Sequence, residues 1–304
     1  MSRLLITALS AAALCVGGCS GDEVASGVDG VTVTKAATPK VTVAKGLSTD
    51  KTEVKVIEDG GGEKVAVGDT VKINYLIVNG RTGDQFDSSF AAGRPSTLVV
   101  SKNNLLPGFI KAIDGQTVGS RVLAAVAPAD GFGAARSDLD VRKDDTIVYL
   151  IDIVAKLPSE ATGKTKKAPA TLPQLVLDAS GRPEKFESDA QVPPEVTRES
   201  AHVLIQGTGD TIEEGQQVSA QYVGQVYPAG EVFDSSWSRE TPGSFVMTPG
   251  QNIDCLADLL VGQKVGSRVV LVCPADSAFG DEGRAPDVKP GDTLIFAVDV
   301  LDAA

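Results

Sequence analysis

The stretch Phe86-Asp87-Ser88-Ser89 occurs a second time in this chain, as Phe233-Asp234-Ser235-Ser236. The two copies are 147 positions apart (233 − 86 = 147), and the same offset joins Tyr75 to Tyr222. Further landmarks share this offset: Val118-Gly119-Ser120-Arg121 with Val265-Gly266-Ser267-Arg268, Gly133 with Gly280, and Thr146 with Thr293. Because all these landmarks keep one register without a gap, the chain contains two copies of one domain.

Length and composition agree with two globular domains. The chain has 304 residues, of which 42% are hydrophobic and 22% are charged. This length suits two domains, and the composition allows a hydrophobic core. The 28 basic and 40 acidic residues give a net charge of −12, which argues against nucleic acid and against anionic lipid headgroups as partners. The basic cluster 164–167 is interpreted as a solvated part of a linker.

The N-terminus is typical of an export signal. Arg3 precedes an apolar run from Leu4 to Val16, which ends in Val16-Gly17-Gly18-Cys19. The run is shorter than the roughly 20 residues needed to span a bilayer. A buried helix is the alternative interpretation. The ending resembles a bacterial lipobox, which implies that Cys19 carries a diacylglycerol and becomes the N-terminus after cleavage.

We therefore expect five segments. They are a lipoprotein signal peptide over 1–18, a flexible stalk over 19–30, a first domain over 31–157, a Pro- and Lys-rich linker over 158–171, and a second domain over 172–304. The mature protein is expected outside the cytoplasm, lipid-anchored to the cell membrane through Cys19. The second domain includes a polar excursion over 182–195, whose structure the pattern leaves open.

The cysteine pattern predicts a disulfide in the second domain. Cys15 leaves with the signal peptide and Cys19 is the anchor, so Cys255 and Cys273 remain. Two thiols in one exported domain are expected to pair, and a bridge across this loop would stabilise the domain by roughly 3 kcal/mol. Two separate buried thiols are the alternative. With His202 as the only histidine and no cluster of metal-ligand spacing, we expect no metal, no cofactor and no histidine-based triad.

The apolar periodicity predicts an α+β fold for each copy. Alternation indicates strands near 41–43, 54–56, 70–78, 96–100, 121–126 and 146–154, and the second copy opens with 175–177 and 203–205. The stretch 106–115, with Pro107 near its start and Gly115 at its end, predicts one short helix. No Lys-Ser/Thr follows Gly60-Gly61-Gly62, so these glycines indicate a hairpin turn and no phosphate loop. Since no crossover helices join the strands, each domain is expected to be a curled antiparallel β-sheet wrapped around one short α-helix.

These motifs resemble the FKBP-type peptidyl-prolyl cis-trans isomerases, the macrolide-binding immunophilins. The resemblance rests on the strand tyrosine, the Phe-Asp-Ser-Ser segment, the Leu-Pro-Gly-Phe helix start at 106–109, the Val-Gly-x-Arg motif, and the Pro-Ala-Asp segment before Phe132-Gly133. It covers nearly everything except the signal, the stalk and the linker. The whole chain resembles exported two-domain bacterial lipoproteins of that family.

The resemblance implies an apolar prolyl pocket in each copy, with one carboxylate at its rim. In the first copy the implied residues are Tyr75, Phe86, Asp87, Leu106, Phe109, Phe132, Val141 and Tyr149. In the second copy they are Tyr222, Phe233, Asp234, Ile253, Leu256, Phe279, Val288 and Phe296, with Arg239 where the family often has an arginine near the aspartate. Taken singly, each aromatic residue fits a plain core position and each Asp-Ser-Ser fits a turn. Their joint register favours a pocket.

The implied chemistry needs no nucleophile. Rotation about an X-Pro bond crosses a barrier of roughly 18–20 kcal/mol, and an apolar pocket favours the twisted state because that state carries less charge separation. The resemblance implies that the backbone N–H of Leu106 or Ile253 holds a substrate carbonyl. Two roles stay open for the aspartate of each pocket, which either faces the rotating carbonyl or orients the neighbouring tyrosine.

The two copies depart from the family pattern at three positions. One departure is shared by both copies, and the other two distinguish one copy from the other. The usual tyrosine before the glycine of the penultimate segment is Phe132 and Phe279, so a hydroxyl donor to ligand is missing from both. The helix-start aromatic is Phe109 in the first copy but Leu256 in the second. Ala92 stands where the second copy has Arg239. We therefore predict that the first copy is the better catalyst.

Two functions remain at this point. The favoured one is a peptidyl-prolyl isomerase that assists the folding of exported proteins by binding their X-Pro segments. The alternative is a non-catalytic chaperone or peptide-binding module in which one or both domains are inactive.

Overall fold

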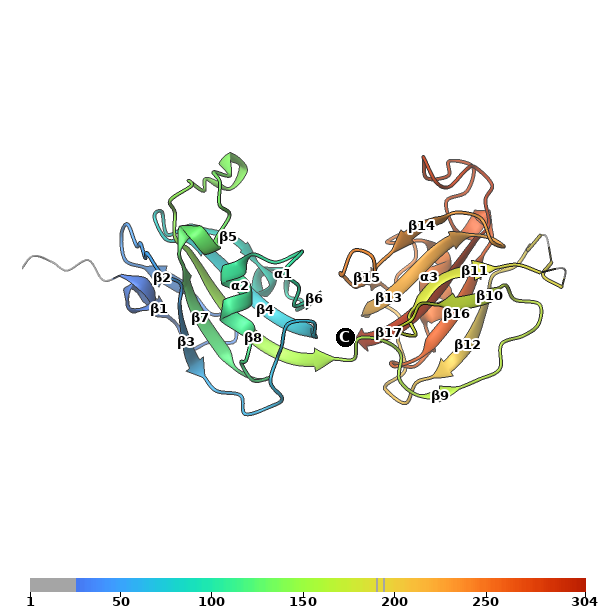
Figure 1. Ribbon diagram of the computed structural model, residues 1–304, viewed down its shortest axis with the longest axis horizontal. Helices are drawn as coiled ribbons and strands as arrows, with labels where there is room; N and C mark the ends of the chain where they lie inside the picture. The colour runs from blue at the N-terminus through green and yellow to red at the C-terminus, as the bar shows by residue number, and fades with distance from the viewer. Residues whose placement is uncertain (1–25, 190, 194) are drawn as a thin grey trace, which may run out of the picture.

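The computed structural model describes residues 26–189, 191–193 and 195–304. The predicted signal peptide, Cys19 and most of the predicted stalk lie outside these residues. The described chain forms two domains, each built on an antiparallel β-sheet (Figure 1). None of the helices in this part of the chain is long and apolar enough to cross a membrane.

The first domain has a six-stranded sheet and one main helix. Its strands are β3 (Glu53–Glu58), β4 (Thr70–Asn79), β5 (Gln85–Ser88), β6 (Ser96–Val99), β7 (Arg121–Val126) and β8 (Ile147–Leu157). They are ordered β3-β7-β8-β4-β5, and β6 also pairs with β4. Helix α2 (Pro107–Ile113) packs on β7 and β8. A second, four-residue helix α1 (Ser89–Ala92) follows β5 and was not predicted.

Helix α2 forms where the sequence places its start signal and its apolar face. Pro107 occupies the first turn, where its missing N–H costs nothing. Phe109, Ile110 and Ile113 point from one face into the core and are buried. A helix of seven residues is marginal by itself, so its stability comes from this contact with the sheet.

The second domain repeats this plan with one further edge strand. Its sheet contains β9 (Lys164–Thr165), β12 (Ser200–Gln206), β13 (Gln217–Val226), β14 (Val232–Ser235), β15 (Gly243–Val246), β16 (Arg268–Cys273) and β17 (Leu294–Ala303). The order is β14-β13-β17-β16-β12-β9, and β15 also pairs with β13. Helix α3 (Asp254–Leu260) packs on β16 and β12. The predicted antiparallel sheets with few helices are therefore confirmed.

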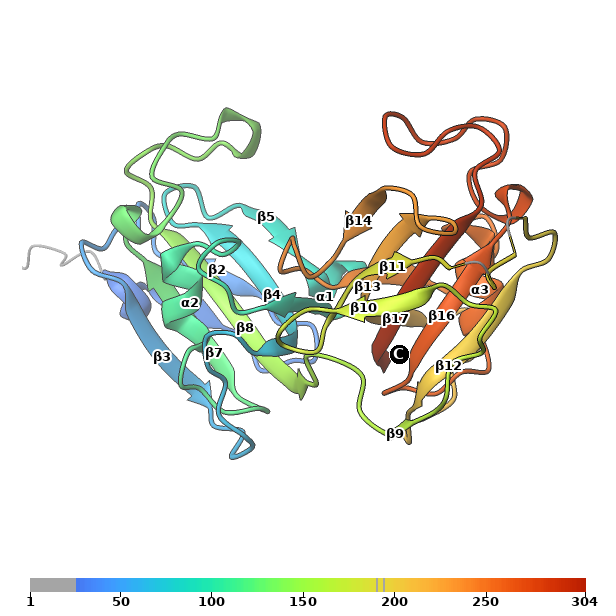
Figure 2. The same cartoon turned by 45° about the vertical axis from the view of Figure 1, so that its right-hand side comes forward.

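The predicted strands near 41–43 and 175–177 are present, but each belongs to a separate hairpin on the outer face of the sheet of its domain. These segments do not open the main sheets. Strand β2 (Val41–Val43) pairs with β1 (Val31–Val33), and β10 (Gln174–Leu177) pairs with β11 (Pro183–Glu187). Figure 2 shows β10 and β11 crossing the outer face of the second sheet, and β11 contacts β13. The first half of the polar excursion over 182–195, whose structure the sequence left open, forms strand β11.

The reason for these hairpins lies in the central strands. Residues Ile147 to Ile151 of β8 are all buried, so their side chains fill both faces of the sheet. Helix α2 covers one face only. The β1–β2 hairpin covers the other, where its valines pack against Leu76, Val148 and Leu150. A sheet that is apolar on both faces needs a cover on each.

Parts of the predicted stalk and linker are ordered. The 3-10 turn η1 (Gly27–Gly30) contacts β3 and β7, so the segment 19–30 is not a flexible stalk throughout. Strand β9 (Lys164–Thr165), inside the predicted linker, pairs with β12. The backbone N–H of Ala161 donates to Asp299 at 2.8 Å. These hydrogen bonds fasten the linker to the second domain.

The two domains contact each other through β4 and β6 on one side and β13 and β17 on the other. The Lys72 ammonium pairs with Asp302 at 2.5 Å, and its side chain is only 14% exposed. The hydroxyls of Thr97 and Ser219 are 2.9 Å apart. Figure 1 shows these parts of the two domains facing each other, with the C-terminus between them.

Candidate functional site

The repeated Phe-Asp-Ser-Ser segment places one carboxylate beside one tyrosine in each domain. The second serine of each segment joins the segment to the strand that carries the tyrosine. Ser89 Oγ accepts a hydrogen bond from the backbone N–H of Tyr75 at 2.8 Å, and Ser236 Oγ accepts one from the N–H of Tyr222 at 2.7 Å. Ser88 caps α1 by accepting from the N–H of Ala91. These bonds hold the preceding aspartate at the mouth of a cup.

The first cup is a cavity of about 290 Å³. It is lined by Tyr75, Ile77, Asp87, Ser96, Leu98, Asn104, Leu105, Leu106, Phe109 and Tyr149. The rings of Phe109 and Tyr149 meet edge to face at 5.2 Å between centroids. The Tyr75 hydroxyl donates to Asp87 Oδ2 at 2.9 Å, and the Ser88 N–H donates to Asp87 Oδ1 at 2.8 Å. The cup is thus an apolar hollow with one oriented carboxylate.

Apart from Asp87, the side chains that line the first cup are uncharged at neutral pH. Desolvation, followed by the hydrogen bond to Asp87, raises the pKa of Tyr75 above its ordinary value. Burial likewise raises the pKa of Tyr149. Both phenols therefore stay protonated at neutral pH, and Tyr75 acts there as a hydrogen-bond donor.

Three residues predicted for the first pocket do not line it. Phe86 and Phe132 pack against each other, with ring centroids 6.3 Å apart, at the edge of the core. Val141 is a core residue and is 4% exposed. The prediction for Phe86, Phe132 and Val141 is therefore corrected: they belong to the core of the first domain and not to the lining of the cup.

The second cup is smaller, at about 200 Å³. It is lined by Tyr222, Phe233, Asp234, Phe245, Asn252, Ile253, Leu256, Phe279, Arg284 and Phe296. Here the Tyr222 hydroxyl donates to Asp234 at 2.5 Å. Arg239 lies at the rim, where its guanidinium pairs with Asp234, donates to the Tyr222 hydroxyl at 3.0 Å and lies over the Tyr222 ring. Val288, predicted for this pocket, lies in the core at 2% exposure.

Phe233 lines the second cup whereas Phe86 does not line the first, and the residue at one position of the neighbouring strand explains this difference. Phe233 meets Phe296 edge to face at 5.7 Å and lines the second cup. A Cβ on Gly224 would lie 2.7 Å from Phe233 and 2.8 Å from Phe296, so only glycine leaves room for this pair. The first domain has Ile77 at that position, and Ile77 lines the cup in place of Phe86.

Sequence reasoning missed several lining residues, including Ile77 and Leu98 in the first cup and Phe245 in the second. A signal for one of them was present, because Ile77 lies two positions after Tyr75 and shares its face of β4. Leu98 and Phe245 depend on the pairing of β6 with β4 and of β15 with β13. Such pairing is not legible from spacing.

The arginine of the Val-Gly-Ser-Arg motif has a structural role. Arg121 makes two hydrogen bonds of 2.7 Å with the Asp152 carboxylate, which joins β7 to β8. Arg268 pairs with Asp299 in the same way at 2.6 and 2.7 Å, with both side chains buried. These ion pairs lie outside both cups.

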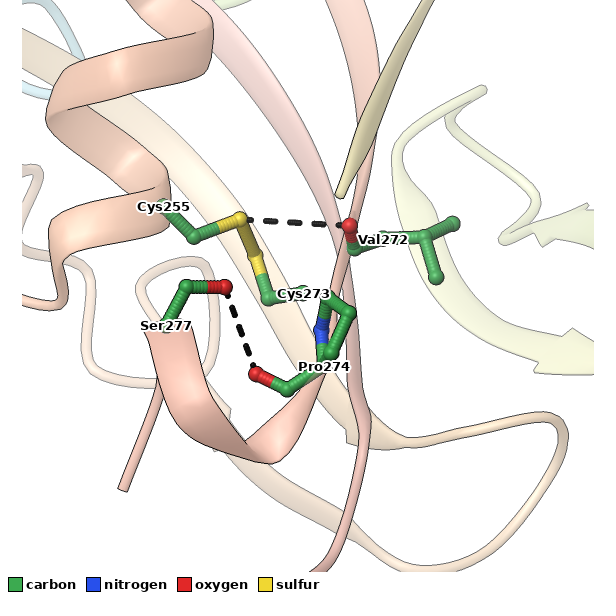
Figure 3. Close-up of a disulfide and its surroundings, with 5 residues drawn as sticks. All are labelled: Cys255, Val272, Cys273, Pro274 and Ser277. Carbon is green, nitrogen blue, oxygen red and sulfur yellow. Dashed lines mark hydrogen bonds between the residues drawn. A yellow bond between two sulfur atoms is a disulfide. The ribbon is translucent and has the colours of Figure 1, made fainter. Parts of the chain in front are cut away.

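The helix beside the second cup is tied to the sheet by a disulfide. Figure 3 shows the bond between Cys255, in the first turn of α3, and Cys273 at the end of β16. The equivalent positions in the first domain are Gly108 and Val126, where a Cβ on Gly108 would lie 2.2 Å from Val126 Cγ1. The same contact is therefore made by close packing in one domain and by a covalent bond in the other.

A larger cavity of about 570 Å³ lies elsewhere, between the linker, β10 and the outer faces of β12 and β16. Of its charged wall residues, Arg268 is already paired with Asp299, and Lys166 donates to Gln206. The two smaller cups are the stronger candidates because they recur at the same place in both domains with the same tyrosine and aspartate. Among the described residues, no group of three or more His, Cys, Asp or Glu could hold a metal ion.

Comparison with known proteins now gives the family. The model of the FKBP-type peptidyl-prolyl cis-trans isomerase family matches residues 61–154 and 209–301. The chain belongs to this family. It is thus assigned as an FKBP-type peptidyl-prolyl cis-trans isomerase, and both matched regions contain one of the two cups.

The chain is similar to curated proteins that are named as FK506-binding proteins or as FKBP-type isomerases. An FK506-binding protein of Streptomyces anulatus is 42% identical over 99 residues, which is 32% of this chain and 80% of the relative. A probable FKBP-type isomerase of Haemophilus influenzae is 29% identical over 174 residues, 56% of this chain and 68% of the relative. The crystal structure of the three FKBP domains of wheat FKBP73 is 20% identical, covers 83% of this chain and 94% of its own, and has a TM-score of 0.33.

Proposed function

We propose that this isomerase accelerates the cis-trans interconversion of X-Pro bonds in exported proteins, and that the first cup is its main catalytic site. The observation that carries the proposal is the first cup itself. Tyr75, Phe109 and Tyr149 surround an apolar hollow of about 290 Å³ with a single carboxylate at its mouth. A prolyl ring is apolar and compact, and such a hollow suits it.

The apolar walls account for the rate enhancement. The planar peptide bond is held by resonance that separates charge between nitrogen and oxygen, and rotation through about 90° removes that resonance. An environment poor in water stabilises the less polar twisted state relative to the planar one. The cup supplies this environment with its aromatic rings, so no nucleophile and no proton transfer are needed.

Two groups of the first domain are suited to position the bound peptide. The backbone N–H of Leu106, at the start of α2, has no hydrogen-bond acceptor within the described chain and is free to bind a substrate carbonyl. Asp87 holds the Tyr75 hydroxyl at 2.9 Å. Of the two roles open for this aspartate, orienting the tyrosine is the one the geometry favours. A fixed grip on both sides of the prolyl bond reduces the entropy lost on reaching the twisted state.

For the second cup we propose binding of prolyl segments with slower turnover. Its floor is Leu256 in place of an aromatic ring, and its carboxylate is neutralised by Arg239. A cup that grips a client without rapid release would help to hold unfolded chains. This is the part of the molecule that favours the chaperone alternative.

We further propose that the protein acts outside the cytoplasm, anchored by a lipid on Cys19. The signal-like N-terminus supports this. The disulfide between Cys255 and Cys273 supports it independently, because structural disulfides persist in oxidising compartments. The partners would then be X-Pro segments of unfolded or partly folded exported proteins.

An isomerisation assay on the full chain tests the catalytic proposal. Asp87→Ala is expected to remove most of the turnover of a short X-Pro peptide, and the matched variant Asp234→Ala is expected to remove little. Full turnover in Asp87→Ala, with the chain still folded by circular dichroism, would contradict the assignment of the first cup.

The anchor has its own test. Intact-mass measurement of the membrane fraction should find a chain that begins at a diacylated Cys19, and Cys19→Ser should release the protein from that fraction. A membrane-bound chain that retains Met1 would refute the proposed processing.

A further inference from the structure

One turn of the second domain sets the charge pattern of the second cup. This turn, residues 237–241, carries Arg239, whose guanidinium pairs with Asp234 and donates to the Tyr222 hydroxyl at 3.0 Å. Asp234 and Tyr222 both line the second cup. A displacement of this turn would therefore release the carboxylate and the phenol that face a bound peptide.

The same turn is held from the first domain. The Asn104 side-chain amide donates to the backbone carbonyl of Arg239 at 2.6 Å and to that of Glu240 at 3.2 Å. The Asn103 amide donates to Glu240 Oε1 at 2.9 Å, and the Ser101 hydroxyl bonds to Glu240 Oε2. Asn104 also lines the first cup. A continuous set of hydrogen bonds thus leads from the wall of one cup to the rim of the other.

In this turn, Glu240 keeps its hydrogen bonds to the first domain although its backbone conformation is unfavourable for a residue with a side chain. Glu240 adopts φ 49°, a left-handed conformation that disfavours residues with a Cβ. At the equivalent position the first domain has Gly93, with φ 67°. Glycine is the ordinary residue for such a turn. The second domain has instead a glutamate whose carboxylate is the acceptor for both hydrogen bonds from Ser101 and Asn103.

We propose that the two cups are coupled through this turn, and that Asn104 of the first domain is a positioning residue for the second cup. The proposal deepens the proposed function, because it rests on both cups binding prolyl segments. A peptide in the first cup contacts Asn104 and competes for, or reorients, its amide. That changes the hold on Arg239 and hence the affinity of the second cup, since two sites couple when both act on one shared element.

The chain contains its own reporter for this turn. Trp237 is the only tryptophan in the sequence and lies two residues before Arg239. Its side chain packs against the outer-face core of the second sheet. Its fluorescence therefore follows the turn, whereas the first domain has no tryptophan to add to the signal.

The experiment uses the full chain with Phe233→Ala, which disables the second cup without touching Arg239. The probe is acetyl-Ala-Leu-Pro-Ala-amide, and calorimetry establishes one bound peptide per chain and the saturating concentration. Saturation of the first cup is expected to change the Trp237 emission. Adding Asn104→Ala should reduce the amplitude of that change at least fivefold at saturation, and adding Glu240→Gly, which restores the residue type of the first domain, should reduce it partly.

The matched control is Gln251→Ala. Gln251 occupies in the second domain the position that Asn104 has in the first (104 + 147 = 251) and makes no side-chain bond to the first domain within the described chain. It should keep the full amplitude. In the chain with both cups intact, calorimetry should resolve two affinities that depend on each other about fivefold or more, and Asn104→Ala should make them independent.

A saturated first cup with unchanged Trp237 emission overturns the coupling, as does an amplitude that survives Asn104→Ala. Neither readout measures isomerisation. A chain that binds the peptide and shows the fluorescence change without turnover would therefore count against the proposed catalysis and leave the coupling supported.

Discussion

The two domains hold their single main helix in different ways. In the first, Gly108 of α2 lies directly against Val126, and the Lys111 ammonium pairs with Asp130 at 2.7 Å. In the second, the disulfide between Cys255 and Cys273 makes the first of these contacts. The positions of Lys111 and Asp130 are occupied there by Asp258 and Ser277, which cannot form an ion pair. The helix occupies the same place in both. The sheet therefore determines where the helix lies, and the anchor can be changed without changing the fold.

The cups differ in the same manner. Ile77, Phe109 and Ala92 of the first domain correspond to Gly224, Leu256 and Arg239 of the second. Each replacement alters what the cup offers a ligand, and none alters the strand order around it. In this fold, the residues that line the cup can therefore change while the sheet and the helix around it keep their arrangement.

The largest effect is expected from the covalent anchor. Reduction of the disulfide, or Cys255→Ala with Cys273→Ala, should lower the free energy of unfolding of the second domain by about 3 kcal/mol. The first domain should be unaffected because it contains no cysteine within 31–157. Urea denaturation followed by Trp237 fluorescence reports unfolding of the second domain, which contains the only tryptophan in the sequence. An unchanged midpoint under reducing conditions would show that packing of α3 suffices without the bond.

The next effect comes from exchanging the strand residue behind the aromatic pair. Gly224→Ile should destabilise the second domain by about 1–3 kcal/mol, because its side chain must displace Phe233 or Phe296. It should also abolish peptide binding by the second cup, measured by calorimetry. The matched variant is Ile77→Gly in the first domain, which should let Phe86 move toward Tyr149. If Gly224→Ile binds peptide normally, Phe233 does not form the wall of that cup.

Exchanging the floors of the two cups should shift turnover. Phe109→Leu removes the edge-to-face contact with Tyr149, worth about 0.5–1.5 kcal/mol, together with apolar area. Isomerisation by the full chain should fall about tenfold. Leu256→Phe in the second domain should raise the turnover of an Asp87→Ala chain. Equal turnover in Phe109→Leu and the parent would mean that an aromatic floor is not needed.

The smallest effect concerns the ionic anchor of the first domain. The hydrogen bond from Lys111, and then that from Thr52, lowers the pKa of Asp130. Because the folded pKa lies below the unfolded value of about 3.9, the pair stabilises the domain above that pH and the contribution is lost as pH falls through the folded pKa. The Lys111 side chain is 55% exposed, so Lys111→Ala should cost less than about 1 kcal/mol at pH 7.

Hydrogen exchange of the α2 amides at pH 7, compared between the parent and Lys111→Ala, measures this difference. The stabilities of the two proteins, measured by urea denaturation, should converge as the pH falls through the folded pKa of Asp130. Asp258→Ala, at the equivalent position of α3, is the control, since Asp258 forms no salt bridge in the described part of the chain. A Lys111→Ala difference that persists unchanged at low pH would assign it to lost packing of the lysine stem.

The fold was largely predictable because its signals are local and occur twice. Alternation in 70–78 and 121–126 predicted β4 and β7, and Pro107 with the apolar residues after it predicted α2. The strands near 41–43 and 175–177 were also predicted, but their place in separate outer hairpins was not. Short valine pairs such as 41–43 carry no information about which partner strand they will join.

Of the candidate site, sequence placed Tyr75, Asp87, Leu106, Phe109 and Tyr149 in one cup, and the structure brings these five together. It could not place Phe86, whose direction depends on Ile77 across the strand pair. Nor could it find the bond between Asn104 and the Arg239 turn, which joins residues 135 positions apart.

The amino-acid sequence by itself determined that this protein has two domains of one family, each with a sheet, a helix and a tyrosine–aspartate pair, because a repeated register imposes the same local periodicity twice. Only the tertiary structure decided which aromatic rings face each cup, how each helix is anchored and how the two cups meet. Those features depend on side chains that contact one another across strands and domains, and such contacts leave no periodic trace along the chain.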